Sequence, residues 1–235
     1  MFRSLIFILF ILFSVGASAQ KIYVVSIGIA DYPGTKNDLK LSANDAKAVY
    51  RLYIQNTVSE AKLLTNERAT RDNILTKARN LFAKAGKDDI VVLFFSGHGY
   101  KGGFVAYDNM LSYQDVKKLF SACKSNNKMI FADACFSGGL REGVGAKGVL
   151  DKDVMLFMSS RSKETSLELR GMRNGLFTAC LVRCLKGGAD VNHDRIITAK
   201  ELYQSVSQGV KELSVDKQHP VMWGSFDDNM PVMIW

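Results

Sequence analysis

Two apolar runs of this sequence each lead into a residue that could take part in nucleophilic catalysis. Residues 90–95 are six consecutive apolar residues followed closely by His98, and residues 129–132 are followed closely by Cys135. A free cysteine has a pKa near 8.5, so a neighbouring imidazole that takes the thiol proton makes the sulfur a stronger nucleophile. The same imidazole can later protonate a leaving amine, which contributes about 10²–10⁴-fold to the rate. His98 and Cys135 are therefore candidates for a catalytic pair.

The strands and helices that must position this pair are predicted to alternate along the chain. Short β-rich or apolar runs predict strands, and stretches with a period near 3.6 predict helices. Strands that alternate with helices, and that are apolar throughout, indicate a parallel sheet covered on both faces. We expect an α/β fold, a three-layer sandwich with a mostly parallel central sheet. The predicted strands are 22–29, 90–95, 129–132 and 154–158, and the predicted helices are 39–55, 70–85, 112–121, 175–185 and 198–213.

In such a sheet, ligands bind outside the carboxyl ends of the strands. The runs before His98 and Cys135 are separated by one helix, so a right-handed crossover makes them neighbours and brings the two side chains together. The backbone amides of Gly99 and Cys135 are then candidate oxyanion donors. Taken singly, a cysteine after a buried strand is more often inert core and a histidine in a turn is more often a polar surface residue. Gly102-Gly103-Phe104 predicts a small hairpin after the predicted strand 90–95.

Length, composition and charge exclude several classes of protein. The chain has 235 residues, of which 47% are hydrophobic and 23% charged. This is ordinary globular composition, which excludes a disordered chain, a collagen-like fibre and a polytopic membrane protein. The net charge is +8, but the basic residues are scattered among acidic ones, so we expect no nucleic-acid partner. Four cysteines without framework spacing predict free, buried thiols rather than disulfide staples.

The first residues have the pattern of a secretory signal peptide. A short basic start with Arg3 is followed by an apolar run at residues 5–13 and by Ala17-Ser18-Ala19. The alternative, an uncleaved anchor, needs a longer apolar stretch of about 20 residues. We therefore expect residues 1–19 to be removed, residues 20–235 to form a single domain, and the protein to be exported to the periplasm or secreted. After cleavage we expect no membrane association.

The two chemical segments resemble those of a known peptidase family. Ser96-Gly97-His98-Gly99 and the segment from Asp133 to Gly138 look like the catalytic segments of caspases and metacaspases, with the prokaryotic, metacaspase-like branch most similar. Further similarity lies in residues 25–31, in Asn44-Asp45-Ala46, and in the short motifs at 158–160, 164–166 and 175–178. The resemblance implies a caspase-like fold with a large-subunit-like part at 20–140, an exposed loop at 141–152 and a small-subunit-like part at 153–235. It implies a cysteine endopeptidase acting on peptides or proteins.

The resemblance also implies a substrate preference. In metacaspases, the positions matching Asp45 and Asp133 line the primary specificity pocket, and Ser96 lies beside them. Two partly buried carboxylates favour a cationic partner, so we expect cleavage after Arg or Lys. The alternatives are structural. Asp133 could bind nearby amides at a strand end, and Asp45 could be a helix-start carboxylate next to the helix dipole.

Two features of the later sequence suggest regulation. The glycine-rich loop 141–152 carries Arg141, Lys147 and Lys152, which would suit self-processing by an enzyme of basic specificity; an intact surface loop is the alternative.

Further along, Asp190, Asn192, Asp194 and Glu201 have the spacing of a calcium-binding EF-hand loop. Against this, Arg195 stands where the loop needs glycine, and Thr198 with Glu201 also fits a helix capping box. Calcium at these four residues therefore remains an alternative to a capped helix start.

Other functions stay open as alternatives. The first is a catalytically silent caspase-like binding module, responsive to calcium. The absence of a Gly-x-Ser-x-Gly motif argues against an α/β-hydrolase esterase, and the absence of a Cys-x-x-Cys pair argues against a thiol redox protein. The proposed chemistry needs no cofactor, no metal ligand set is assigned, and the sequence does not decide between a monomer and a dimer.

Overall fold

The structure, a computed structural model, describes residues 19–100, 102–134, 154–160, 167 and 171–235. Cys135, the loop 141–152, residues 164–166 and nearly all of the expected signal peptide lie outside the described residues. Within the described residues, no helix has both the length and the apolar character needed to cross a membrane.

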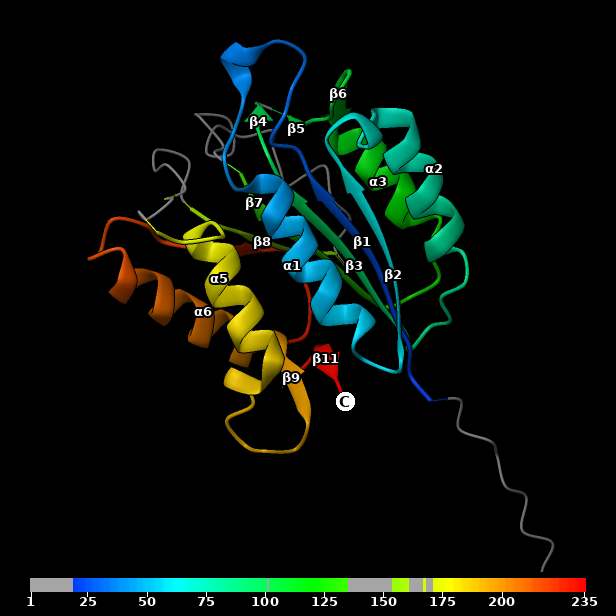
Figure 1. The fold of residues 1–235 in the computed structure, drawn as a ribbon. Coiled ribbons are helices and arrows are strands. Elements are labelled where there is room, and N and C mark those ends of the chain that lie inside the picture. Colours follow the sequence, from blue (N-terminus) through cyan, green and yellow to red (C-terminus); the bar gives the residue numbers. More distant parts are fainter. Residues whose placement is uncertain (1–18, 101, 135–153, 161–166, 168–170) are drawn as a thin grey trace, which may run out of the picture.

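A central six-stranded sheet forms the middle layer (Figure 1). Its strand order is β10-β8-β7-β3-β1-β2. Neighbouring strands are parallel except that β10 runs antiparallel to β8. The strands are β1 (Ile22–Gly28), β2 (Ser59–Thr65), β3 (Ile90–Ser96), β7 (Asn127–Asp133), β8 (Val154–Met158) and β10 (Val221–Trp223). The mostly parallel sheet expected from the alternating pattern is confirmed.

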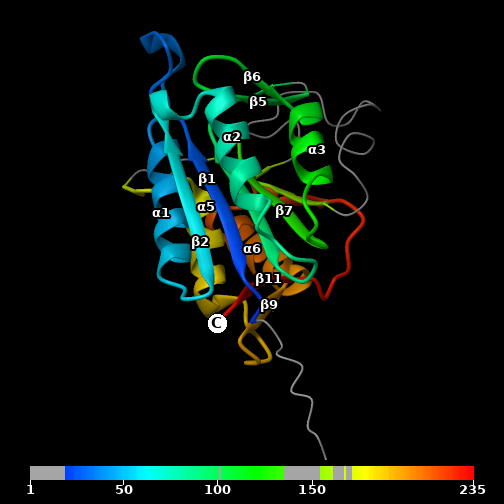
Figure 2. The ribbon, with the colours of Figure 1, turned by 90° about the vertical axis from the view of Figure 1, so that its right-hand side faces the viewer.

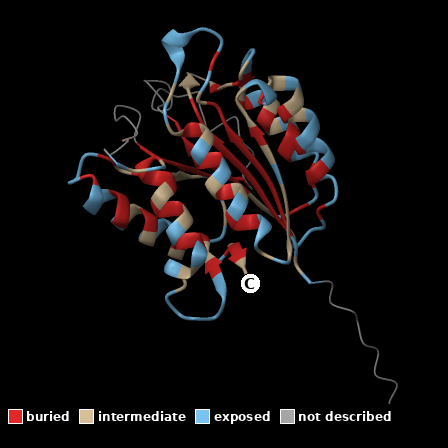
Figure 3. Cartoon of the chain, viewed as in Figure 1, coloured by how far each residue is buried: buried red, intermediate tan, exposed pale blue. Residues whose placement is uncertain are grey.

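Helices cover both faces of the sheet, so the strands are buried on both sides (Figures 2 and 3). Every residue of β1 and of β3 is buried, which explains why both read as continuous apolar runs. One core cluster joins the sheet to α2 (Arg71–Phe82) and α3 (Tyr113–Ser121). A second cluster joins the other face to α1 (Ser42–Ile54), α5 (Leu176–Arg183) and α6 (Ala199–Leu213). The three-layer sandwich is confirmed.

Side-chain caps fix the starts of three helices. The Thr70 hydroxyl accepts the Asn73 amide at the start of α2. Ser112 and Asp115 form a capping box at the start of α3, and Thr198 and Glu201 form one at the start of α6. Each cap satisfies amide groups that the first helical turn leaves without a backbone partner. The observed helix starts and ends therefore lie within a few residues of the predicted ones.

Two small sheets complete the fold. β4 (Gly99–Tyr100), β5 (Gly103–Val105) and β6 (Met110–Ser112) form an antiparallel sheet, which confirms the predicted hairpin. Gly102 makes its turn with φ of 111°, a conformation that glycine adopts without strain. β9 (Ile196–Thr198) pairs with β11 (Pro231–Ile234), so the apolar C-terminal tail packs on its own chain. Short helical turns lie at Thr35–Asn37, Asn66–Arg68 and Cys184–Gly188.

Two strands of the sheet, β2 and β10, were not predicted. β2 carries Glu60 and Lys62, and most of its residues are half-buried or exposed. It lies at the edge of the sheet, where one side of the strand has no neighbour, so it lacks the apolar run that marks the central strands. Elsewhere, Cys123, Cys180 and Cys184 are buried free thiols, as predicted.

Candidate active site

The carboxyl ends of β3 and β7 lie side by side, as predicted. The two strands pair in parallel, with Ser96 opposite Asp133 at the end of the register. The Gly97 amide continues the pairing by donating to the Asp133 carbonyl over 3.2 Å. His98 follows on the first strand, and Cys135 follows two residues after Asp133, just beyond the described part of the chain. The topology therefore brings the two candidate catalytic segments to one edge of the sheet.

A backbone carbonyl orients the His98 ring. The ring nitrogen Nε2 lies 2.8 Å from the carbonyl oxygen of Asn37, in the short helical turn after β1. A carbonyl oxygen can only accept, so this contact requires a proton on Nε2 of the neutral ring. The other nitrogen, Nδ1, is then left as a proton acceptor. Sequence reasoning missed Asn37, because any residue type can supply a backbone carbonyl.

Tyr32 supports His98 from a second direction. Its hydroxyl accepts the His98 amide over 2.9 Å and donates to the Val105 carbonyl over 3.2 Å, and the two rings lie 4.9 Å apart. Burial raises the pKa of Tyr32 to about 12, so the hydroxyl stays neutral near pH 7. A side chain at Gly97 would begin 2.7 Å from this hydroxyl, so glycine is needed for the close approach.

The second feature of this edge is a pair of buried carboxyl groups. Asp45 in the first turn of α1 is 2% exposed, and Asp133 at the end of β7 is 6% exposed. The Ser96 hydroxyl donates to Asp45 Oδ2 over 2.9 Å. Residues Asp45, Ser96 and Asp133, which the resemblance groups in one pocket, therefore meet in space from three different elements.

A fourth element, the start of α5, closes around the carboxyl pair. The Asn174 side-chain amide and the Gly175 backbone amide both donate to Asp45 Oδ1 over 2.9 Å. The Thr178 hydroxyl and amide donate to Asp133 Oδ2 over 2.7 and 3.2 Å. A side chain at Gly175 would begin 2.7 Å from Asp133 Oδ2 and 3.3 Å from Asp45 Oδ2. Sequence reasoning gave these α5 residues no role, since no motif marks them.

The environment of Asp45 changes its acidity. Burial, together with the charge of Asp133, raises the pKa of Asp45 to about 8, against the lowering effect of hydrogen bonds from Asn174, Ser96 and Gly175. Two carboxylates cannot both be ionised at low cost in a buried site without a cation between or beside them. The site is therefore chemically suited to a positively charged group.

Gly99, the other candidate oxyanion donor, is the first residue of β4 and pairs with Phe104. It directly follows His98 at the same edge of the sheet. Its relation to the Cys135 sulfur and amide falls outside the described residues.

The candidate calcium residues form a different arrangement. Asp190 accepts the amides of Asp194 and Arg195 over 3.2 Å each, and the Glu201 carboxylate caps α6 by accepting from Thr198. In the described part of the chain, no group of three or more His, Cys, Asp or Glu side chains is placed to hold a metal ion. We derive no step through calcium, and calcium binding at this loop stays a prediction.

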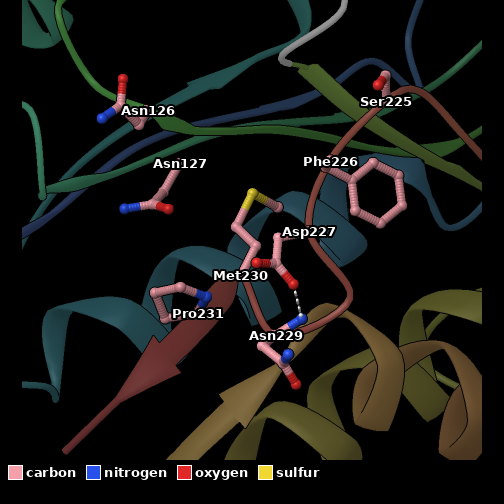
Figure 4. A pocket seen from close by; sticks show the side chains of 8 residues that line it. All are labelled: Asn126, Asn127, Ser225, Phe226, Asp227, Asn229, Met230 and Pro231. Carbon is pink, nitrogen blue, oxygen red and sulfur yellow. Dashed lines mark hydrogen bonds between the residues drawn. The ribbon is translucent and has the colours of Figure 1, made fainter.

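A separate pocket of about 590 Å³ lies at the opposite end of β7 (Figure 4). Its walls include Asn126, Asn127, Phe226 and Met230, and Asp227 accepts the Asn229 amide over 2.8 Å. None of its eight lining residues is a cysteine or histidine. The chemistry expected from the sequence therefore belongs to the carboxyl edge of the sheet and not to this pocket.

Comparisons with known proteins agree with this geometry. The family model described as a caspase domain matches residues 22–230. Metacaspase-4 of Arabidopsis thaliana is 30% identical over 191 residues, which cover 64% of this chain and 46% of that protein. The chain thus spans less than half the length of this curated relative.

Solved structures show the same fold. A protein of Geobacter sulfurreducens superposes with a TM-score of 0.69 at 17% identity, covering 91% of this chain and 99% of that one. Caspase-1 of Spodoptera frugiperda superposes with a TM-score of 0.64 at 13% identity, covering 88% and 87% of the two chains. The expected caspase-like fold and the resemblance to caspases and metacaspases are both confirmed. Because the family model covers residues 22–230, the chain belongs to the caspase-domain family of peptidases.

Proposed function

We propose that this protein is an exported cysteine endopeptidase that cleaves peptides or proteins after Arg or Lys. The observation that carries the proposal is the buried pair Asp45 and Asp133, which lies at the same sheet edge as His98. Two buried carboxyl groups side by side are costly to ionise together, and an arginine or lysine side chain brings a positive charge to them.

The proposed reaction is acyl transfer through the Cys135 sulfur. His98 Nδ1 takes the thiol proton, while the Asn37 carbonyl holds the protonated Nε2 in place. The thiolate attacks the scissile carbonyl, and the amides of Gly99 and Cys135 stabilise the developing oxyanion. His98 then protonates the leaving amine, and water hydrolyses the thioester with His98 again as the base. No cofactor is required for these steps.

Export and self-processing complete the proposal. Residues 1–19 act as a signal peptide, and residues 20–235 form the mature peptidase domain. Arg141, Lys147 and Lys152 provide cleavage sites within 141–152 that match the proposed specificity. Purified protein should appear as two fragments, whereas Cys135→Ala protein should stay intact; fragments of the inactive variant in a clean preparation would contradict self-processing.

The function is tested by hydrolysis of fluorogenic peptides that end in Arg, Lys or Asp before the reporter. We expect turnover of the Arg and Lys peptides alone, and its loss in both Cys135→Ala and His98→Ala proteins. Folding of each variant is checked by its thermal unfolding midpoint. Turnover after Asp would overturn the specificity, and no turnover in the presence of reductant, with and without calcium, would favour the silent binding module instead.

A further inference from the structure

The carboxyl oxygens of the pocket meet different kinds of donor. Asp45 Oδ1 and Asp133 Oδ2 each accept a backbone amide, from Gly175 and Thr178, and an amide N–H cannot reverse its role. Asp45 Oδ2 accepts the Ser96 hydroxyl. A hydroxyl can turn and accept, because it carries both a proton and lone pairs. Asp45 can therefore carry a proton on Oδ2 and donate it to Ser96 while Oδ1 keeps its N–H donors.

The surroundings of the pair favour such a proton. Thr178 is fully buried at the start of α5, with both carboxyl groups beside it at 2% and 6% exposure. The neighbouring charge that acts on Asp45 comes from Asp133, and burial with this charge raises the pKa of Asp45 to about 8. Arg173, just before the segment that contacts Asp45, is exposed to solvent. Two interacting carboxyl groups titrate as one unit, so the midpoint of the titration is a property of the pair.

We propose that the Asp45–Asp133 pair holds a single proton in the free protein, that a cationic substrate side chain displaces this proton into solvent, and that Thr178 is the positioning residue that sets this exchange. This inference rests on the proposed function, because it concerns the same pocket. It adds a regulation that the function alone does not require: substrate affinity is coupled to pH through the specificity pocket, independently of the catalytic pair.

The test measures proton release on binding, without catalysis. An acetylated tripeptide amide that ends in arginine and is otherwise uncharged is titrated into Cys135→Ala protein by calorimetry. Titrations at pH 6 to 9 in two buffers of different ionisation enthalpy give the number of protons released. The arginine side chain stays charged throughout this range, so released protons come from the protein. The matched control is the same peptide with citrulline, a neutral side chain of similar shape.

We expect the arginine peptide to release close to one proton at pH 6 to 7. Its affinity should rise about tenfold for each pH unit below the midpoint of the pair and level off above it. The citrulline peptide should bind weakly and release no proton from the pair. Arginine-peptide affinity that is constant from pH 6 to 9, proton release below about a tenth of a proton, or no binding at any pH would each overturn the proposal.

Substitution of Thr178 tests its positioning role. Thr178→Val keeps the shape but removes the hydroxyl donor to Asp133, so the pH at which affinity levels off should rise by about 0.5 to 1 unit. Thr178→Ser should restore the original midpoint. A merely structural role would lower thermal stability without moving this midpoint, and that result would reject Thr178 as the positioning residue.

The two proposals fail in different ways. If the arginine peptide binds with proton release but wild-type protein does not hydrolyse arginine substrates, the pocket inference stands and the peptidase function falls. If wild-type protein cleaves after arginine with a KM that is independent of pH from 6 to 9, the function stands and the proton exchange falls.

Discussion

Two acidic clusters stand out in the sequence of this protein and differ sharply in the structure. Asp45 and Asp133 come from distant parts of the chain, are nearly fully buried and share donors from β3 and α5. Asp190 and Asp194 lie within one exposed loop, and Asp190 is engaged by the backbone amides of that same loop. In the first cluster, burial and the charge of Asp133 together raise the pKa of Asp45 to about 8.

The difference shows what turns carboxylates into a binding site. In the exposed loop, water solvates each carboxylate and the local amides satisfy it, so little free energy is gained from a further partner. In the buried pair, neighbouring elements exclude water, so a cationic ligand or a proton that balances the charge gains more free energy there than in the loop. The two clusters differ in burial and in whether their residues come from distant elements of the fold, and not in the number of acidic residues.

The largest expected effect is a loss of peptidase activity on substitution in the buried cluster but not in the exposed one. Asp133→Asn keeps the shape and an acceptor for Thr178 but removes the charge that would face a substrate cation. We expect kcat/KM for arginine peptides to fall by about 10²–10³, since breaking a buried charge pair costs several kcal/mol. Asp190→Asn is the matched control and should stay within about twofold of wild type. Equal losses in both variants would break the comparison.

A smaller effect is expected at Tyr32, which contacts His98 and Val105 from a distant part of the chain. Tyr32→Phe removes the hydroxyl that links the His98 amide to Val105 while keeping the ring beside the imidazole. We expect kcat to fall about tenfold, because small misplacements of a catalytic group are costly, with KM nearly unchanged. Steady-state kinetics on one arginine peptide separates the two constants. A rise in KM at constant kcat would show that Tyr32 serves substrate binding instead.

Substitution of Asp45 should change the stability of the folded protein by an amount that depends on pH. The pKa of Asp45 is raised to about 8 in the folded protein, so stability is lost as pH rises from about 4 to about 8 and the buried group ionises. Asp45→Asn lacks this titration and should unfold at a higher temperature than wild type at pH 8, by at least the 2–4 °C that about 1 kcal/mol gives in a domain of this size.

The advantage of Asp45→Asn should shrink toward pH 4, where wild-type Asp45 is protonated. Thermal unfolding followed by circular dichroism at pH 4, 6 and 8 measures this difference. A variant less stable than wild type at pH 8 would show that the ionised carboxylate is a structural anchor.

The smallest effect concerns the exposed loop. Glu201→Ala removes the carboxylate that caps α6 and should cost about 0.5–1 kcal/mol of stability. Glu201→Gln keeps a side-chain acceptor for the cap and should be nearly as stable as wild type, with or without calcium. If calcium raises the unfolding temperature of wild type but not of Glu201→Gln, this loop is a metal site and the comparison fails.

The sequence predicted most of the fold because burial leaves a direct trace in it. β1, β3 and β8 are buried along their whole length and consist almost entirely of apolar residues, and Thr70, Ser112 and Thr198 mark helix starts with their side chains. β2 escaped prediction, because an edge strand with alternating charged residues has no apolar run.

Prediction of the site depended on residue type. His98, Asp45 and Asp133 stand out by their chemistry and by the family resemblance. Asn37 acts through a backbone carbonyl and Gly175 through a backbone amide and its missing side chain, so neither leaves a signal in residue type. Thr178 is one of many threonines until α5 is placed against β7 in three dimensions.

The most direct test of the account compares matched arginine and citrulline peptides as substrates of the wild-type protein, with Cys135→Ala as the blank. Arginine and citrulline side chains have similar shapes and differ in charge, so the ratio of their kcat/KM values isolates the effect of the carboxyl pair. The account predicts a preference for arginine of about 10² or more, with no turnover by Cys135→Ala. Equal cleavage of the two peptides would contradict a carboxylate pocket that selects a cation.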